Sequence, residues 1–198
     1  MAKKIPYGLT DYFRIVTEDF YYVDKTKYIE DLEKTAAFLF LIRPRRFGKS
    51  LFLNMLNCYY DVKYADRFEE LFGNQYIGKH PTAEQGKYLV LRFNFSMVRA
   101  TDDKLEAAFN RHISLETAYF ASVYASYFKP DFQEQLKLIP EAAGRLEYIC
   151  LCAKEQGLSI YLLIDEYDNF TNTILSSKGN DVYHSLTHDS GFYRSFFN

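Results

Sequence analysis

The sequence predicts an α/β protein in which a parallel sheet is flanked by helices. Three apolar runs favour strands, at 38–42, 88–95 and 159–164, and helical hydrophobic patterns separate them. Strands that alternate with helices are typical of a parallel sheet whose faces the helices cover. The chain has 198 residues without an internal repeat or a flexible linker, so we expect one domain over residues 1–198.

The first predicted strand leads into the most informative stretch of the chain. Phe38–Ile42 is nearly all apolar, as expected of a strand that is buried on both faces. The strand ends at Arg43-Pro44, because proline cannot continue a central ladder. From Lys49 onward the apolar residues recur at helical spacing, which predicts an amphipathic helix.

Two helices are expected between the second and third strands. Thr101-Asp102-Asp103 places acidic residues where they suit a helix N-terminus, so a long helix begins there. The other helix is bounded by Pro140, just inside its start, and by Gly157, just past its end. The third strand, 159–164, runs directly into an acidic pair, and the tail after Asn169 is polar with weak periodicity.

Composition excludes several classes of protein. Hydrophobic residues make up 48% and charged residues 25%, which is typical of a globular chain rather than a disordered or fibrous one. The 24 Lys and Arg residues against 26 Asp and Glu exclude a broadly basic nucleic-acid coat, although a local basic patch stays possible. Three cysteines favour a reducing compartment, and no apolar run has the length of a membrane span. We therefore expect a soluble, cytoplasmic protein with no membrane partner.

The segment RPRRFGKS, between a predicted strand and a predicted helix, indicates a phosphate-binding loop. Such a loop needs backbone N–H groups at a helix N-terminus and a glycine where the backbone approaches phosphate oxygens. It also needs a lysine for the phosphates and a hydroxyl for Mg²⁺, and Gly48, Lys49 and Ser50 supply these groups in order. Arg43 stands where the general pattern has glycine. Two interpretations of Arg43, Arg45 and Arg46 stay open: they form a solvated cationic turn, or they add charge that strengthens an anion site.

A second motif supplies the carboxylates that nucleotide hydrolysis requires. Asp165 and Glu166 follow the third predicted strand directly. A carboxylate at the end of a buried strand can hold the metal, and a second one can orient or deprotonate the attacking water. Both motifs together predict a P-loop nucleotide site that uses ATP and Mg²⁺.

The sequence resembles the AAA-ATPase-like family along essentially its whole length. The resemblance is carried by IPYGLTDYFRI, YYVDKTKYIEDLE, FLIRPRRFGKSLFLNML and LLIDEYD. In that family the Arg-Pro-Arg-Arg form of the loop is usual, so Arg43 departs only from the broader P-loop pattern. The resemblance implies a P-loop NTPase-like sheet with the strand order 5-1-4-3-2.

The resemblance also implies roles for individual residues. Catalytic roles fall to Glu166, which would activate water, and to Lys49. Ser50 and Asp165 would hold the metal. The nucleotide would contact the loop at Arg45, Arg46, Phe47, Gly48, Lys49, Ser50 and Leu51. Arg45 or Arg46 could add charge near the γ-phosphate, although a finger from a neighbouring subunit is the commoner arrangement.

Members of the family typically continue with a sensor strand and a nuclease-like domain of the PD-(D/E)XK type. No convincing apolar strand follows residue 170, so we expect an incomplete sheet and a chain that is the N-terminal part of a longer ATPase–nuclease. A nucleic-acid partner would then act through the absent domain, and self-association is possible. A fourth parallel strand within residues 170–198 would contradict this interpretation.

Other candidate sites have simpler structural explanations. Asp24-Lys25-Thr26 matches a family motif and could lie near the nucleotide, but Asp24 would also cap the helix that runs through Tyr28. His184 and His188 have the spacing of metal ligands on one helix face, and a solvated surface is the alternative. Cys150-x-Cys152 lies in an apolar helical pattern and predicts buried thiols.

The sequence leaves three functions open. An ATPase needs the phosphate-binding loop, the groups that hold the metal and the carboxylate that activates water. A switch would bind nucleotide without turnover and regulate a partner or the nuclease-like domain. A nucleic-acid-binding fragment would use the cationic cluster at 43–49, and its DNA binding would depend steeply on salt.

Overall fold

A computed structural model describes residues 3–35, 37–44, 46–98, 105–167 and 192–197. The chain divides into two compact units, Met1–Leu89 and Val90–Asn198. The first contains α1 (Tyr12–Thr17), α2 (Tyr28–Glu33), α3 (Lys49–Tyr60), η1 (Val62–Arg67), α4 (Phe68–Phe72) and α5 (Tyr76–Lys79). The strand β1 (Tyr88–Asn94) leads into the second unit, which contains η2 (Phe95–Met97), α6 (Leu105–Val123), η3 (Ala125–Tyr127), α7 (Phe132–Lys137), α8 (Ala142–Glu155), β2 (Ser159–Asp165) and α10 (Phe192–Phe197).

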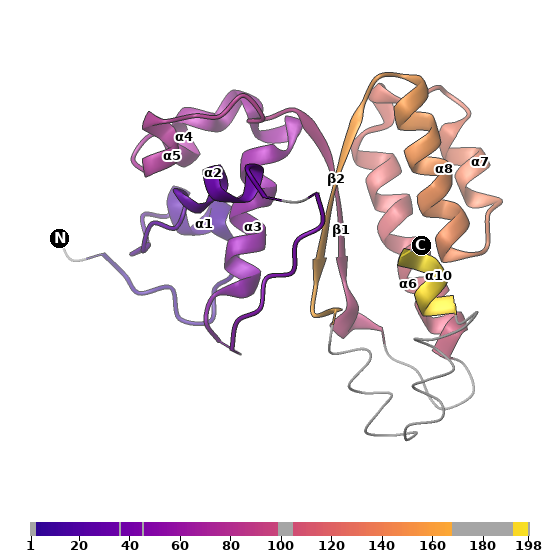
Figure 1. Ribbon diagram of the computed structural model, residues 1–198, viewed down its shortest axis with the longest axis horizontal. Helices are drawn as coiled ribbons and strands as arrows, with labels where there is room; N and C mark the ends of the chain where they lie inside the picture. Colours follow the sequence, from indigo (N-terminus) through magenta and orange to yellow (C-terminus); the bar gives the residue numbers. More distant parts are fainter. Residues whose placement is uncertain (1–2, 36, 45, 99–104, 168–191, 198) are drawn as a thin grey trace. The chain divides into compact units, whose positions relative to one another are not determined.

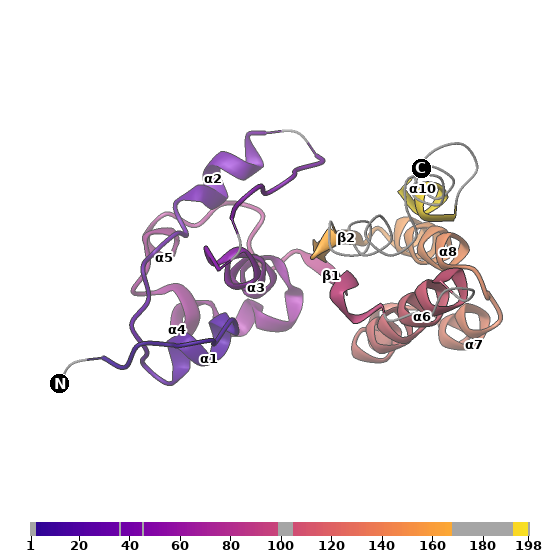
Figure 2. The same ribbon diagram turned by 90° about the horizontal axis from the view of Figure 1, so that it is seen from below.

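The first unit is a small helical assembly built around α3. On α3, Phe52, Met55, Leu56 and Tyr59 are buried at the spacing of one helix face, and α1 packs against this helix. Figure 2 views α3 nearly end-on, with the other helices of the unit around it. Tyr12 of α1 is fully buried, and its hydroxyl donates to the carbonyl of Leu71 at 2.9 Å. Burial raises the pKa of Tyr12 far above its usual range, so this hydroxyl stays protonated.

The second unit packs α6, α7 and α8 beside a two-stranded parallel sheet (Figure 1). Its core is largely aromatic. The ring of Phe95 lies 5.4 Å from that of Phe109 and 6.3 Å from that of Phe196, both in edge or tilted contacts that favour aromatic packing. Helix α8 ends as expected, because Gly157 adopts a φ of 67° and the next amide, of Leu158, donates to the carbonyl of Ala153 at 2.9 Å.

Most of the predicted elements are confirmed within the described residues. The second and third predicted strands correspond to β1 and β2, and the helix that begins at Lys49 is α3. The helix between Pro140 and Gly157 is α8, although it begins at Ala142, so Pro140 precedes it rather than lying just inside. The predicted start of α6 at residues 101–103 lies outside the described residues, and so does most of the tail that was expected to lack a strand.

The predicted strand at Phe38–Ile42 is wrong. These residues belong to no helix or strand, and Phe38, Phe40 and Ile42 are 89, 74 and 84% exposed. An apolar run becomes a central strand only where a neighbouring strand completes its hydrogen-bond ladder, and the described sheet consists of β1 and β2 alone. The structure is therefore α/β with a small parallel sheet.

No described helix combines the length and the low charge that a membrane-spanning helix needs.

Candidate functional site

The loop before α3 has the backbone geometry of a helix N-terminus that can accept an anion. Gly48 caps α3 in the left-handed conformation, with a φ of 76°. The first hydrogen bond of the helix runs from the amide of Phe52 to the carbonyl of Gly48 at 2.9 Å, so the amides of Ser50 and Leu51 lie in the first turn, where they point out of the helix end. The side chain of Asn54 donates to the carbonyl of Ser50 at 2.9 Å and fixes this turn.

The glycine at position 48 is required by conformation rather than by crowding. A Cβ added there would meet no atom of the described residues within 4 Å, but the positive φ would strain any other residue. The same space in front of the helix end is open to a ligand. Because the helix dipole places partial positive charge there and the first turn contains no acidic residue, the loop suits phosphate.

The structure places the predicted loop residues along the entrance to α3. Arg46 and Phe47 are exposed, and Lys49, Ser50 and Leu51 are half-buried in the first turn of the helix. Arg45 was also predicted to contact the nucleotide, and it lies outside the described residues.

The predicted carboxylates lie at the end of β2. Asp165 is the last residue of the strand and is only 8% exposed. Glu166 follows in the turn, half-buried, and its amide donates to Oδ1 of Asp165 at 2.9 Å. The end of β2 therefore presents a buried carboxylate beside a second, more accessible one.

Backbone strain marks both predicted stretches. Among the described non-glycine residues, a positive φ occurs at Asp19, Arg46 and Glu166. Two of these three are predicted site residues, with φ values of 67° for Arg46 and 55° for Glu166. The left-handed conformation costs an L-residue about 1–2 kcal/mol, and such strain concentrates at ligand-binding and catalytic turns.

A contact that the sequence did not predict anchors the turn after β2. The hydroxyl of Tyr193, on α10, donates to the carbonyl of Tyr167 at 3.1 Å. Tyr193 is 8% exposed, and its ring packs against Phe95 and Phe109. This hydrogen bond fixes the backbone one residue beyond Glu166. The sequence signal available was the pair of apolar residues at 193 and 196, spaced as one face of a helix.

The triplet Asp24-Lys25-Thr26 has a structural role that the sequence did not predict. Asp24 Oδ2 accepts the amide of Tyr76 at 2.7 Å, and Thr26 Oγ1 accepts the amide of Ile77 at 3.1 Å. The residue that precedes α2 is Lys27, so Asp24 does not cap that helix. Asp24 and Thr26 instead satisfy the first amides of α5, about fifty residues further along the chain.

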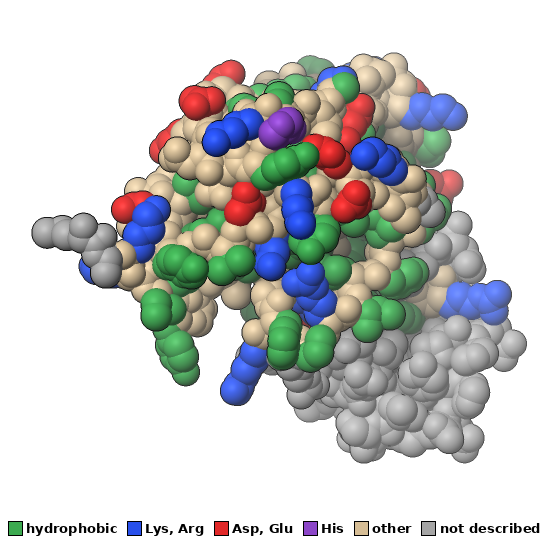
Figure 3. All heavy atoms as spheres, turned by 60° about the vertical axis from the view of Figure 1, so that its left-hand side comes forward, with side chains coloured by type: hydrophobic (Ala, Val, Ile, Leu, Met, Phe, Trp, Pro, Cys, Tyr) green, Lys and Arg blue, Asp and Glu red, His purple; other side chains and the backbone are tan. Residues whose placement is uncertain are grey.

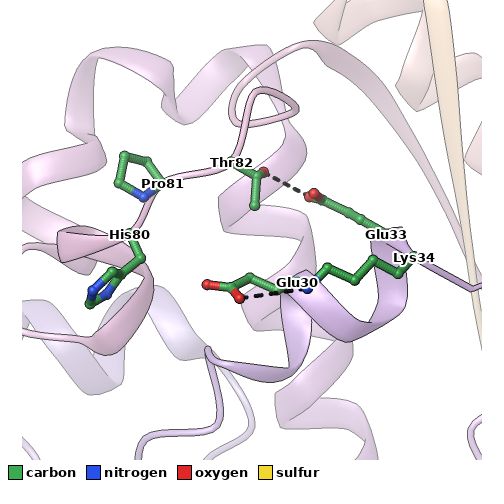
Figure 4. Close-up of a pocket in the computed structure, with 6 residues that line it drawn as sticks. All are labelled: Glu30, Glu33, Lys34, His80, Pro81 and Thr82. Carbon is green, nitrogen blue, oxygen red and sulfur yellow. Dashed lines mark hydrogen bonds and ion pairs between the residues drawn. The ribbon is translucent and has the colours of Figure 1, made fainter.

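A cavity of about 500 Å³ lies beside α2 and contains none of the predicted site residues (Figure 4). It is lined by Glu30, Glu33, Lys34, His80, Pro81 and Thr82. Glu33 Oε1 accepts hydrogen bonds from Tyr60 Oη at 3.1 Å and from Thr82 Oγ1 at 2.8 Å. The bond from Tyr60 joins α2 to the C-terminal end of α3, and the bond from Thr82 joins α2 to the segment after α5, which makes Glu33 a structural anchor.

The remaining candidates give no second site within the described residues. No three His, Cys, Asp or Glu side chains of the described residues are placed to hold a metal ion, and His184 and His188 lie outside them. Cys150 is exposed and Cys152 half-buried, so the prediction of buried thiols is wrong for Cys150. The buried face of α8 runs instead through Arg145, Ile149 and Ala153.

The fold and the site together define an α/β protein with a glycine-capped helix N-terminus and a strand that ends in paired carboxylates. The sequence model of the AAA-ATPase-like family, described as "Predicted AAA-ATPase", matches residues 6–198, and the chain belongs to this family.

One similar protein is described as an uncharacterized protein in the vnfD 5′ region of Azotobacter chroococcum mcd 1. It is 49% identical over 55 residues, which are 27% of this chain and 11% of that protein. The chain therefore matches about a tenth of the relative's length. No solved structure matches the chain.

Proposed function

We propose that the protein binds Mg·ATP through the loop before α3 and hydrolyses it. The observation that carries the proposal is the left-handed Gly48 at the start of α3, directly followed by Lys49 and Ser50. Family membership supports the same general activity.

The phosphate end of the nucleotide would lie at the N-terminus of α3. The first-turn amides would donate to phosphate oxygens, and the Lys49 ammonium would reach the β- and γ-phosphates. The exposed guanidinium of Arg46, with that of Arg45, would add positive charge there. These fixed donors would stabilise the charge that develops on the transferring phosphoryl group.

The carboxylates after β2 would complete the chemistry. Ser50 and Asp165 are the proposed metal holders, and their oxygen atoms are of the type that Mg²⁺ prefers. When bound, Mg²⁺ neutralises charge on the phosphate oxygens. Glu166 would hold the attacking water in line with the γ-phosphate and accept its proton. The two halves belong to different units of the chain, so their joint action is part of the proposal.

Titration calorimetry with Mg·ATP tests the phosphate site. We expect micromolar binding by the wild-type protein and its loss in Lys49→Ala, while Lys79→Ala, which removes an exposed lysine of the same unit, binds as the wild type does. If Lys49→Ala remains folded and binds with unchanged affinity, the phosphate site is wrong.

The alternative is a switch that binds nucleotide without turnover. One observation favours it: Oδ1 of Asp165 already accepts the Glu166 amide within the turn, which leaves less of that carboxylate for a metal. Phosphate release by Glu166→Gln, with Glu147→Gln on the exposed face of α8 as the control, separates the two functions. An enzyme loses turnover by about 100-fold or more only in Glu166→Gln while both variants keep binding. A switch binds nucleotide and releases no phosphate in any form.

A further inference from the structure

Tyr193 of α10 lies in the aromatic cluster of the second unit, among phenylalanine side chains. Its ring lies 6.1 Å from that of Phe95 and 5.8 Å from that of Phe109, edge-on to both. Phe196, on the same helix, contacts the same two rings. Helix α10 also packs against α8 (Figures 1 and 2). Buried packing therefore holds α10 in place.

The burial of Tyr193 does not follow from the high aromatic content of the chain alone. Tyr7 and Tyr119 are 99% and 65% exposed, and Figure 3 shows hydrophobic side chains spread over the face that it draws. Phenylalanine would fill the same space between Phe95 and Phe109 without bringing a polar group into the cluster. A buried tyrosine hydroxyl costs free energy unless it is hydrogen-bonded, so its acceptor is the informative feature.

The acceptor belongs to the backbone beside the proposed base. The hydroxyl of Tyr193 donates to the carbonyl of Tyr167 at 3.1 Å. Glu166, one residue earlier, has a φ of 55°, a conformation that an L-residue retains only where the surroundings hold the backbone. On its other side, Oδ1 of Asp165 accepts the amide of Glu166 at 2.9 Å. The two bonds flank Glu166 and restrict the direction in which its side chain leaves the backbone.

We infer that Tyr193 is a positioning residue for Glu166: its hydroxyl holds the turn after β2 in the conformation from which Glu166 reaches the attacking water. The inference rests on the proposed function, in which Glu166 accepts a proton from that water. A general base acts only within hydrogen-bond reach of the proton that it takes, and a displacement of about 1 Å can lower the rate about 100-fold. The docking of α10 and the activity of the site are thereby coupled.

Tyr193→Phe tests this role, because it removes the hydroxyl and keeps the ring. Loss of one neutral hydrogen bond shifts the equilibrium between the held and the released turn by about tenfold, so we expect kcat to fall about tenfold. The KM for Mg·ATP should stay within about twofold of the wild-type value, because the lost bond lies at the turn and not in the loop before α3. Phosphate release by the full chain measures both constants.

Tyr124→Phe is the matched control in the same unit. Tyr124 is 4% exposed, and its hydroxyl accepts the amide of Val90 at 3.2 Å, in the first half of β1. Glu166 instead follows the end of the parallel strand β2. Both variants remove a hydrogen bond of a buried tyrosine hydroxyl, so a general loosening of the unit would lower turnover in both. We expect Tyr124→Phe to keep the wild-type kcat.

A double-mutant cycle determines whether Tyr193 acts through Glu166. In Glu166→Gln the group that takes the proton is already absent, so adding Tyr193→Phe should lower the remaining kcat by less than about twofold. A disturbance of the phosphate site would lower turnover by the same factor in both backgrounds.

Hydrogen exchange of the Glu166 amide gives a readout that needs no turnover. Because the turn opens more often without the Tyr193 hydroxyl, this amide should exchange about tenfold faster in Tyr193→Phe. Its exchange in Tyr124→Phe should match that in the wild type.

A loss of kcat in Tyr193→Phe that is absent from Tyr124→Phe and from the Glu166→Gln background supports the inference. Wild-type kcat in Tyr193→Phe overturns it, and so does an equal loss in both backgrounds or in the control. These results leave the proposed hydrolysis standing, because the wild type turns over in each. A wild type that binds Mg·ATP and releases no phosphate overturns the hydrolysis and the inference together, and the wild type alone identifies that outcome.

Discussion

Two stretches of this chain share one pattern and adopt different structures. In each, an apolar run leads into the polar motif of the predicted site: Phe38–Ile42 before the loop at Gly48, and Ser159–Ile164 before Asp165. The second run forms β2, and its Leu163 is 5% exposed. The first run forms no strand and is largely exposed.

The difference lies in the neighbours of each run rather than in its residues. The strand β2 pairs with β1 and packs against α8 in the second unit. The run at 38–42 has no hydrogen-bonded strand beside it among the described residues. An apolar run therefore indicates that a segment gains stability from burial, but the segment that buries it is specified elsewhere in the sequence.

The largest expected difference in the free energy of unfolding is between replacing a buried phenylalanine of β1 and replacing an exposed phenylalanine of the run at 38–42. Phe93→Ala in β1 removes a ring that is 2% exposed and packs on Phe95 and Phe196, so we expect a loss of about 3–5 kcal/mol in the free energy of unfolding. Phe38→Ala removes a ring that is 89% exposed and should change stability by less than about 0.5 kcal/mol.

Urea denaturation of both variants and the wild type measures these changes. Equal losses in the free energy of unfolding for Phe93→Ala and Phe38→Ala would contradict this difference, because they would show that the run at 38–42 is as buried in solution as β1.

Local sequence signals predicted most of the fold and the local structure around both predicted motifs. Gly48, Lys49 and Ser50 were identified because turn chemistry and helix periodicity act over a few residues, and the structure places them at the start of α3. The end of β2 at Asp165 was found for the same reason. The prediction of a strand at 38–42 was wrong because a strand needs a hydrogen-bonding partner for its backbone, and local sequence does not specify that partner.

Contacts between distant residues could not be predicted from one sequence. Asp24 reaches the amide of Tyr76, and Tyr193 reaches the carbonyl of Tyr167, across separations of 52 and 26 residues. Nothing in the composition or periodicity of either segment specifies its partner. Sequence reasoning assigned Asp24 to the adjacent helix because local capping is the commoner pattern.

The packing beside β1 also contains a pH-sensitive group. His112, on α6, is 8% exposed, and its ring lies 6.5 Å from that of Phe95. Its Nε2 has no hydrogen-bond partner among the described residues. Burial lowers the pKa of His112 below its usual value of 6.5, so the unfolded chain takes up a proton before the folded one does.

Stability should consequently fall as the pH drops below about 6.5, with a slope of up to about 1.4 kcal/mol per pH unit from this one group. Urea midpoints between pH 5.5 and 7.5 measure the slope, which His112→Gln should reduce. A wild-type slope that survives in His112→Gln would show that this histidine is accessible to water and that the packing around β1 is looser than its burial indicates.

The smallest expected difference in the free energy of unfolding comes from backbone strain at Glu166 and at Arg46. Glu166 and Arg46 both have a positive φ, which glycine adopts without strain. Strain is retained only where the surroundings hold the backbone in place. Glu166 follows a paired strand and precedes the carbonyl that Tyr193 binds, whereas Arg46 is exposed in the loop.

We therefore expect Glu166→Gly to raise the free energy of unfolding by about 0.5–1 kcal/mol, the relief of the left-handed strain minus the entropy that glycine adds to the unfolded chain. Arg46→Gly should gain less, because the surroundings hold an exposed turn less firmly. Glu166→Ala is the control, since it removes the carboxylate and keeps the strain, and it should not gain stability. Urea denaturation of the wild type and the three variants gives their free energies of unfolding. An equal gain in both glycine variants would mean that the loop before α3 is held as firmly as the end of β2. If Glu166→Gly gains stability while it loses turnover, the strain at this turn is retained for the position of its carboxylate.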